Sequence, residues 1–247
     1  MERAGYEMNR NQIDLFVKDV HDMGIDLSTK QIDQFIAYYE MLIEWNKKMN
    51  LTAITDFEDV LKKHFVDSLS IAKIIDLSHC NSLIDIGTGA GFPGIPIKIA
   101  FPEIKVTLLD SLQKRIYFLD AVIEKLDLEK IETIHGRAED YAKPGILRES
   151  FDLCVSRAVA NLSSLSELCI PFVKTGGMFV AYKSEKAAEE LEFAQNAFKC
   201  LHINQVECIQ VILSDTYYKR NLIKISKEER TPSKYPRKSG MPIKQPL

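Results

Sequence analysis

The feature that most constrains the fold is a short apolar run that leads directly into a glycine-rich turn. Residues 83–86 are Leu-Ile-Asp-Ile, and Gly87, Gly89, Gly91 and Gly94 follow closely. An apolar run of this kind is typical of a buried parallel strand. The glycines permit tight turns and let a ligand lie close to the backbone. The segment therefore predicts a strand of an α/β sheet, with a ligand at its carboxyl end.

The pattern downstream alternates between strands and helices. We predict a helix over 112–126 and another over 162–173, with Gly176-Gly177 beyond the end of the latter, and a third between 185 and 200. Strands are predicted at 105–109, 131–135, 151–155, 178–183, 203–212 and 221–226. This alternation indicates an α/β fold with a doubly wound, Rossmann-like sheet.

The first 80 residues have a helical pattern instead. Apolar residues recur at helical spacing from Ile13 until Gly24, and Ser28 with Gln31 fits a capping box before a second helix. Asp56 can cap a third helix that carries apolar residues as far as 74. We therefore expect a helical N-terminal appendage over 1–80, a ligand-binding sheet domain over 81–228 and a basic tail over 229–247.

Composition restricts the class of protein. The chain of 247 residues is 46% hydrophobic, enough for one sizeable core. It contains no apolar run long enough to span a bilayer and no apolar signal core in its first residues, so we expect a cytoplasmic protein without a membrane contact. The five cysteines are scattered and form no CxxC pair, which favours reduced thiols and no metal site.

The charge is unevenly distributed. A net charge of −3 argues against a protein that holds nucleic acid by bulk electrostatics. From Arg230 onward, however, the chain has five basic and no acidic residues. This tail is either a solvated end or a local phosphate contact.

A carboxylate at the next strand end complements the glycine loop. Leu109-Asp110-Ser111 follows the loop, and the Asp110 carboxylate can accept both hydroxyls of a ribose. After the third strand, the loop 137–140 carries carboxylates that can accept from an adenine amino group. Together these segments predict a nucleoside site.

Two kinds of nucleoside are compatible with the loop. Gly89-x-Gly91-x-x-Gly94 also matches the dinucleotide pattern, so a nicotinamide or flavin enzyme is a competing interpretation. Asp85 argues against it, because a carboxylate there would repel a pyrophosphate but attract an ammonium or a sulfonium group. The bulky Phe92-Pro93 also disfavours a pyrophosphate. These residues favour a nucleoside that carries an ammonium or sulfonium group over a dinucleotide.

Several motifs together resemble one methyltransferase family, RsmG, also called glucose-inhibited division protein B. The likeness covers nearly the whole chain, apart from its first ten residues. It lies in the glycine loop 85–96, Trp45-Asn46, the segment 50–54, His64 with 67–69, 110–115, Ser156 to Ala160, and Tyr235 to Lys238 with Gly240 and Pro242. Ser239 and Met241 depart from the family's proline and threonine in the tail.

The resemblance implies an enzyme that methylates N7 of a guanine in 16S ribosomal RNA, with S-adenosylmethionine as cofactor. It implies cofactor contacts at Gly87, Phe92, Ala138, Glu139 and Arg157, beside Gly89, Gly91, Asp110 and Ser111 from the residue pattern. The expected partner is 16S ribosomal RNA or the small ribosomal subunit, recognised largely by shape, and we expect a monomer. A methyltransferase with a small-molecule or protein acceptor is the alternative.

The chemistry of guanine N7 limits what the protein must supply. N7 carries a free lone pair, so we predict no general base and assign Arg157 as a positioning residue. A flipped guanine could stack on Phe92 or Tyr182. His64 is either hydrogen-bonded to Asp67 or part of the RNA face. The candidate RNA contacts are Asn50, His64, Lys114, Arg115, Lys183, Arg237 and Lys238.

Overall fold

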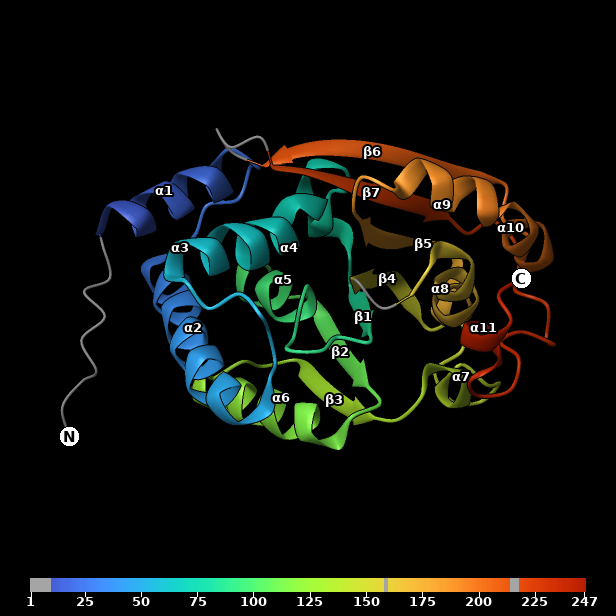
Figure 1. Ribbon diagram of the computed structural model, residues 1–247, viewed down its shortest axis with the longest axis horizontal. Coiled ribbons are helices and arrows are strands. Elements are labelled where there is room, and N and C mark those ends of the chain that lie inside the picture. The colour runs from blue at the N-terminus through green and yellow to red at the C-terminus, as the bar shows by residue number, and fades with distance from the viewer. Residues whose placement is uncertain (1–9, 158–159, 214–217) are drawn as a thin grey trace.

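The computed structural model describes residues 10–157, 160–213 and 218–247. At its centre is one sheet in the order β3-β2-β1-β4-β5-β7-β6 (Figure 1). β7 pairs antiparallel with both β5 and β6, and the other pairings are parallel, which confirms the predicted α/β class. The strands are β1 (Ser82–Ile86), β2 (Lys105–Asp110), β3 (Ile131–His135), β4 (Phe151–Arg157), β5 (Val173–Lys183), β6 (Gln205–Leu213) and β7 (Tyr218–Ser226).

Helices cover both faces of the sheet. One group consists of α1 (Arg10–His21), α2 (Thr29–Met49), α3 (Phe57–Val60), α4 (Asp67–Leu69), α5 (Gly94–Ala100) and α6 (Gln113–Lys125). Figure 1 shows these on one side and the later helices on the other. The later group consists of α7 (Ala138–Tyr141), α8 (Leu162–Cys169), α9 (Ala187–Phe193), α10 (Gln195–Leu201) and α11 (Met241–Lys244).

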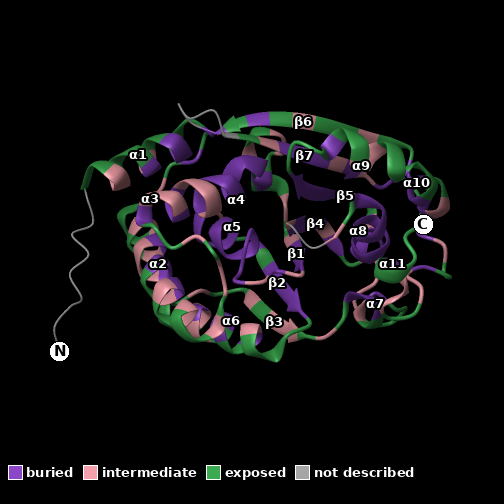
Figure 2. Ribbon diagram, in the orientation of Figure 1, coloured by how far each residue is buried: buried purple, intermediate pink, exposed green. Residues whose placement is uncertain are grey.

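The alternation of side chains along each strand divides the core in two. In β1, Leu83 belongs to the cluster beneath the first helices, whereas Ile84 and Ile86 belong to the cluster beneath α8 and α10. The central strands are buried on both faces (Figure 2). Because the first cluster joins α1 and α2 to β1, β2 and β4, the hydrophobic core is continuous across residue 80.

The N-terminal helices begin where the sequence predicts. Ser28 and Gln31 form the capping box of α2, and Asp56 caps α3 by accepting from the Asp59 N–H. The third helical segment is not regular, because a π-helix (Leu61–Val66) and a 3₁₀ turn (Ser70–Lys73) flank α4. π-Helical turns are rare and often lie at functional sites.

Two boundary predictions are wrong. The helix predicted over 162–173 ends at Cys169 and continues only as a 3₁₀ turn, Ile170–Phe172, so Val173 already belongs to β5. Gly176 and Gly177 lie inside that strand. Gly177 is required there because a Cβ would lie 2.6 Å from the Asp152 carbonyl oxygen of β4. The helix predicted between 185 and 200 is two helices, α9 and α10.

No helix in the described ranges is both long and apolar enough to cross a membrane.

Candidate cofactor and substrate site

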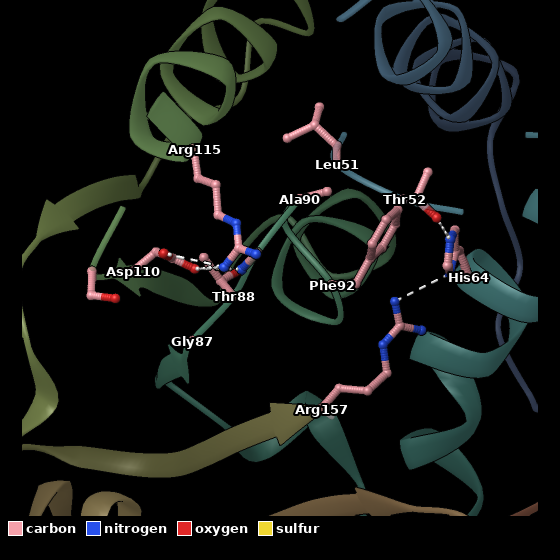
Figure 3. A pocket seen from close by; sticks show the side chains of 12 residues that line it. Leu51, Thr52, His64, Gly87, Thr88, Ala90, Phe92, Asp110, Arg115 and Arg157 are labelled. Carbon is pink, nitrogen blue, oxygen red and sulfur yellow. Dashed lines mark hydrogen bonds and ion pairs between the residues drawn. The ribbon is translucent and has the colours of Figure 1, made fainter. Parts of the chain in front are cut away.

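A cavity of about 380 Å³ opens at the carboxyl ends of β1, β2 and β4. In Figure 3, Asp110 and Arg115 lie on one side of it, Thr52, His64 and Arg157 on the other, and Phe92 between them. The predicted residues Gly87, Gly89, Phe92, Asp110, Ser111, Arg157, His64 and Arg115 all line it. The remaining lining residues are Leu51, Thr52, Thr88 and Ala90.

The glycine loop forms the floor of the cavity. Gly87, Gly89 and Gly91 have φ values of 69°, 65° and 94°, a region that side chains disfavour. At Gly91 a Cβ would lie 2.6 Å from the Ile95 Cδ1 atom, whereas at Gly89 it would enter nearly open space, 4.0 Å from the nearest atom, the Gly87 carbonyl oxygen. Gly91 is therefore required for packing, and Gly89 keeps the cavity open.

Asp85 does not line the cavity, which corrects the expectation that it would face an ammonium or sulfonium group. Its side chain is fully buried beneath the loop. Its Oδ2 atom accepts from the Thr88 hydroxyl at 2.7 Å and from the Gly94 N–H at 2.9 Å. Burial raises the pKa of Asp85 to about 7. Asp85 still argues against a pyrophosphate, for a different reason. Its carboxylate already accepts from the Gly94 N–H, the first N–H of α5, which a pyrophosphate at this helix end would need.

Asp110 lies at the end of β2 with its carboxylate fully engaged. Oδ2 accepts from the Gly89 N–H at 2.9 Å and Oδ1 from the Leu112 N–H at 2.9 Å. The Arg115 guanidinium also contacts it, with 3.1 Å between Nη1 and Oδ2. Arg115, predicted as an RNA contact, thus covers the carboxylate that a ribose would use. A glycine loop beside a carboxylate at a strand end fits a nucleoside cofactor. A ribose can reach the Asp110 oxygens once the Arg115 guanidinium moves away from them.

Arg157 lines the opposite end of the cavity and shares a buried carboxylate with Arg220. The Arg157 Nη1 atom lies 2.8 Å from the Asp67 Oδ2 atom, and Arg220 binds the same carboxylate through two nitrogens at 2.5 and 2.9 Å. Asp67 is fully buried. The Arg157 guanidinium also lies over the Phe92 ring, 4.8 Å from its centroid. The Asp67 carboxylate therefore fixes the Arg157 guanidinium at this end of the cavity.

His64 connects Arg157 to Thr52. Its ring stacks on Phe92 with centroids 4.5 Å apart. Its Nε2 atom lies 2.8 Å from Thr52 Oγ1, and its Nδ1 atom 3.3 Å from Arg157 Nη2. Burial, followed by the nearby Arg157 charge, lowers the pKa of His64 to about 4, so the ring is neutral at pH 7. No direct hydrogen bond joins it to Asp67 among the described contacts, contrary to one of the two expectations.

Neither aromatic residue provides an open stacking platform. Tyr182 is only 1% exposed, and its hydroxyl donates to the Ser68 carbonyl. Phe92 is covered by His64 and Arg157.

Other predicted cofactor contacts lie outside the cavity lining. Ala138 and Glu139 are buried at the start of α7, where the Glu139 Oε1 atom accepts from the Gly240 N–H at 2.7 Å. Gly91 lies in the loop but is not a lining residue. Ala158 and Val159, which carry part of the family resemblance, lie outside the described residues.

Several candidate RNA contacts have protein partners instead. Lys183 is buried, 2.7 Å from Glu190, and Arg237 binds the fully buried Glu167. Lys114 donates to the Met49 carbonyl at 3.3 Å. Asn50 is the C-cap of α2, with φ 49°, and is exposed. Lys238 is exposed.

Sequence reasoning missed Thr52, Asp67 and Arg220 as site residues. Thr52 and Asp67 stand in the motifs that carry the family resemblance, so a signal was present. For Arg220 the sequence contains no such signal, because it lies 153 residues from Asp67, whose carboxylate it binds.

Comparison of the whole chain with solved structures supports the fold. An S-adenosylmethionine-dependent methyltransferase described as putative, from Methanococcus maripaludis, has a TM-score of 0.53 at 18% identity, covering 78% of this chain and 93% of that one. An S-adenosylmethionine-dependent O-methyltransferase from Thermotoga maritima has a TM-score of 0.52 at 16% identity, covering 77% and 72%. At these identities the likeness establishes the Rossmann-like methyltransferase fold alone.

Sequence comparison establishes the family. A protein from Lachnoclostridium phytofermentans named ribosomal RNA small subunit methyltransferase G is 52% identical over 94% of this chain and 96% of its own length. A protein of the same name from Acetivibrio thermocellus is 51% identical over 94% and 96%. The family model GidB, described as rRNA small subunit methyltransferase G, matches residues 31–223. The chain therefore belongs to the GidB family.

Proposed function

We propose that this protein transfers a methyl group from S-adenosylmethionine to N7 of a guanine in the 16S ribosomal RNA of the small subunit. The observation that carries the proposal is a single cavity with two chemically distinct ends. The glycine loop and Asp110 suit a nucleoside cofactor, and the cluster of Arg157, His64 and Thr52 faces them. Family membership supports the activity, because the relatives are named for ribosomal RNA methylation.

S-adenosylmethionine, when bound, supplies an electrophilic methyl group on sulfur. The loop residues Gly87 and Gly89 would hold its amino acid and sulfonium part, and Asp110 its ribose. Guanine N7 carries its own lone pair, so no residue would need to remove a proton as the methyl group passes from sulfur to N7 and S-adenosylhomocysteine is released. The contribution of the protein is alignment and exclusion of water, which together can lower a barrier by several kcal/mol, with about 7–11 kcal/mol as an upper range.

The Arg157 end of the cavity suits an RNA substrate. Arg157 is fixed by Asp67 and is partly exposed, so it can hold a phosphate or the target nucleotide in position. We expect the partner to be a folded RNA or an assembled small subunit, because the chain is acidic overall. The cytoplasmic location, the monomeric state and the RNA-contact residues stay predictions.

Mapping of 7-methylguanosine tests the proposal. Small-subunit RNA from cells lacking the protein would be compared by mass spectrometry with RNA from cells given back the wild type or Gly87→Asp. We expect one modified guanine to disappear and only the wild type to restore it. Unchanged RNA would instead favour the alternative, a methyltransferase with a small-molecule or protein acceptor.

A further inference from the structure

The ion pair between Arg115 and Asp110 lies inside the cavity, where each residue has a partner other than a ligand. The Arg115 Nη1 atom lies 3.1 Å from Asp110 Oδ2 and 3.4 Å from Oδ1, so one nitrogen contacts both oxygens. Figure 3 shows the guanidinium reaching from α6 to the carboxylate. The Arg115 side chain is 35% exposed and that of Asp110 only 2%. The pair can therefore open by movement of Arg115, but not by movement of Asp110.

The Asp110 carboxylate has few acceptor positions left for a ligand. A carboxylate offers about four lone-pair positions, two on each oxygen. The Gly89 N–H uses one position on Oδ2 and the Leu112 N–H one on Oδ1, both at 2.9 Å. Arg115 Nη1 lies against the remaining position of each oxygen. The two hydroxyls of a ribose need the same two positions, so Arg115 and the ribose compete for Asp110.

Of these three donors, the guanidinium is the one that can leave. The Gly89 and Leu112 amides belong to the backbone of the glycine loop and to the N-cap of α6. Arg115 is a long side chain that is partly in solvent. Arg157 provides the contrast, because its carboxylate partner, Asp67, is fully buried and does not line the cavity. A bound ribose therefore releases one arginine of the cavity and leaves the other in place.

A released Arg115 would find no second carboxylate in the cavity. Among the described residues that line it, Asp110 is the only acidic one. Basic residues lie nearby instead, because Lys114 donates to a backbone carbonyl at the end of α2, whose last turn carries Lys47 and Lys48. A guanidinium in such surroundings suits an anion with paired oxygens, and RNA provides one in each phosphate.

We propose that the cofactor displaces Arg115 from Asp110 and that the released guanidinium then binds a phosphate of the RNA. The two roles of Arg115, cover of the ribose site and RNA contact, belong to different states of the protein. Cofactor and RNA then strengthen each other's binding by the same factor, because coupling between two sites is reciprocal. This inference rests on the proposed function and adds to it a link between the two ligands.

The test measures binding rather than methyl transfer. Small subunits from cells lacking the protein provide the RNA. S-adenosylhomocysteine takes the place of the cofactor, because it has no net charge and no methyl group to transfer. The Kd for subunits would be measured with and without it over a series of salt concentrations, and the Kd for S-adenosylhomocysteine by calorimetric titration without RNA. Lys114→Ala is the matched control for Arg115→Ala, because Lys114 is the neighbouring cation and does not contact Asp110.

For the wild type, we expect S-adenosylhomocysteine to tighten subunit binding by roughly fivefold or more, the lower end of couplings between sites. The slope of log Kd against log salt should steepen by about 0.7–0.9, the increment for one phosphate contact. Arg115→Ala should lose both effects, whereas Lys114→Ala should keep both.

The sign of the change in cofactor binding is the sharpest part of the test. Without RNA, Arg115→Ala should bind S-adenosylhomocysteine no more weakly than the wild type, and up to about fivefold more tightly, because a competitor for Asp110 is gone. Lys114→Ala should keep the wild-type Kd. Melting curves check folding, and Arg115→Gln serves if the alanine variant is unstable.

Three results would overturn the inference. Weaker binding of S-adenosylhomocysteine by Arg115→Ala would make Arg115 a cofactor ligand. Wild-type subunit binding that does not respond to S-adenosylhomocysteine would show that the two ligands are not coupled, and an equal response in Arg115→Ala would assign the coupling to other residues. The proposed function fails on a separate observation, namely that RNA from cells lacking the protein still carries every 7-methylguanosine.

Discussion

The C-terminal segment provides the sharpest prediction, because a residue expected to bind RNA has a structural partner instead. Glu167 is fully buried, and its carboxylate accepts from the Arg237 N–H at 2.7 Å, from Nε at 2.9 Å and from Nη2 at 2.7 Å. Arg237→Ala would remove two of these three donor groups and leave a buried carboxylate largely unpaired. Breaking such a pair costs about 3–5 kcal/mol. We expect the lower end, because the Arg237 side chain is 25% exposed.

For a chain of this size a loss of about 3 kcal/mol lowers Tm by roughly 6–12 °C, measurable by calorimetry. Lys238→Ala is the matched control, because the neighbouring side chain is exposed and its removal should change stability by less than about 0.5 kcal/mol. Adding Glu167→Gln to Arg237→Ala should recover part of the loss, since the unpaired charge is then gone. Equal Tm values for Arg237→Ala and Lys238→Ala would refute the structural role of Arg237.

Four further substitutions test the site. Gly94→Ala should melt earlier than Gly89→Ala, because its Cβ would lie 2.4 Å from the Leu108 Cδ2 atom and 2.9 Å from the Asp85 carboxylate. At Gly89 the added Cβ meets no atom closer than 4.0 Å, so its cost is the backbone strain of a φ of 65°, roughly 1–2 kcal/mol. The reverse order of Tm would contradict this packing. Gly89→Ala should instead weaken binding of S-adenosylhomocysteine. Asp110→Asn should weaken that binding by roughly tenfold or more in calorimetric titration, and an unchanged Kd would exclude Asp110 from the cofactor site. Burial lowers the pKa of His64 from 6.5 to about 4, so the unfolded state binds more protons in this window and stability should fall as the pH drops from about 6.5 to 4, by up to roughly 3 kcal/mol. His64→Gln should remove this pH dependence. Asp85, whose raised pKa changes stability with pH in the opposite direction, is present in both the wild type and the variant, so its effect cancels in the comparison. Identical pH profiles of stability for the two proteins would show that His64 does not titrate as described.

The sheet and the glycine-loop end of the cavity were predictable because their signals are local. A strand, a glycine turn and an acidic residue at the next strand end occupy residues 82–110, and the structure places Gly87, Gly89 and Asp110 in one cavity as expected. Parallel strands align their carboxyl ends, so sequence order alone brings these residues together.

Boundary errors arose where tertiary contacts override local pattern. The glycines at 176 and 177 look like the end of a helix, but the Gly176 N–H donates to the Lys227 carbonyl at 2.7 Å and continues the strand. Likewise, Asp85 looked like a ligand-facing carboxylate, and only the packing shows that it holds the loop from below. Sequence can place a carboxylate at a strand end, but it does not say which side of the turn the side chain faces.

The least predictable part is the substrate end, which depends on contacts between distant segments. Arg157 lies on the sheet, but its counter-charge, Asp67, lies in the helical first third, 90 residues earlier. The cavity wall formed by Thr52 and His64 comes from that same third. Because the core is also continuous across residue 80, removing these helices would expose apolar residues of β1 and β2 and leave Arg157 without its carboxylate. The first 80 residues therefore do more than extend a methyltransferase sheet. The strand ends of the sheet provide Gly87, Gly89 and Asp110, and the first third of the chain provides Thr52 and His64 across the cavity from Asp110.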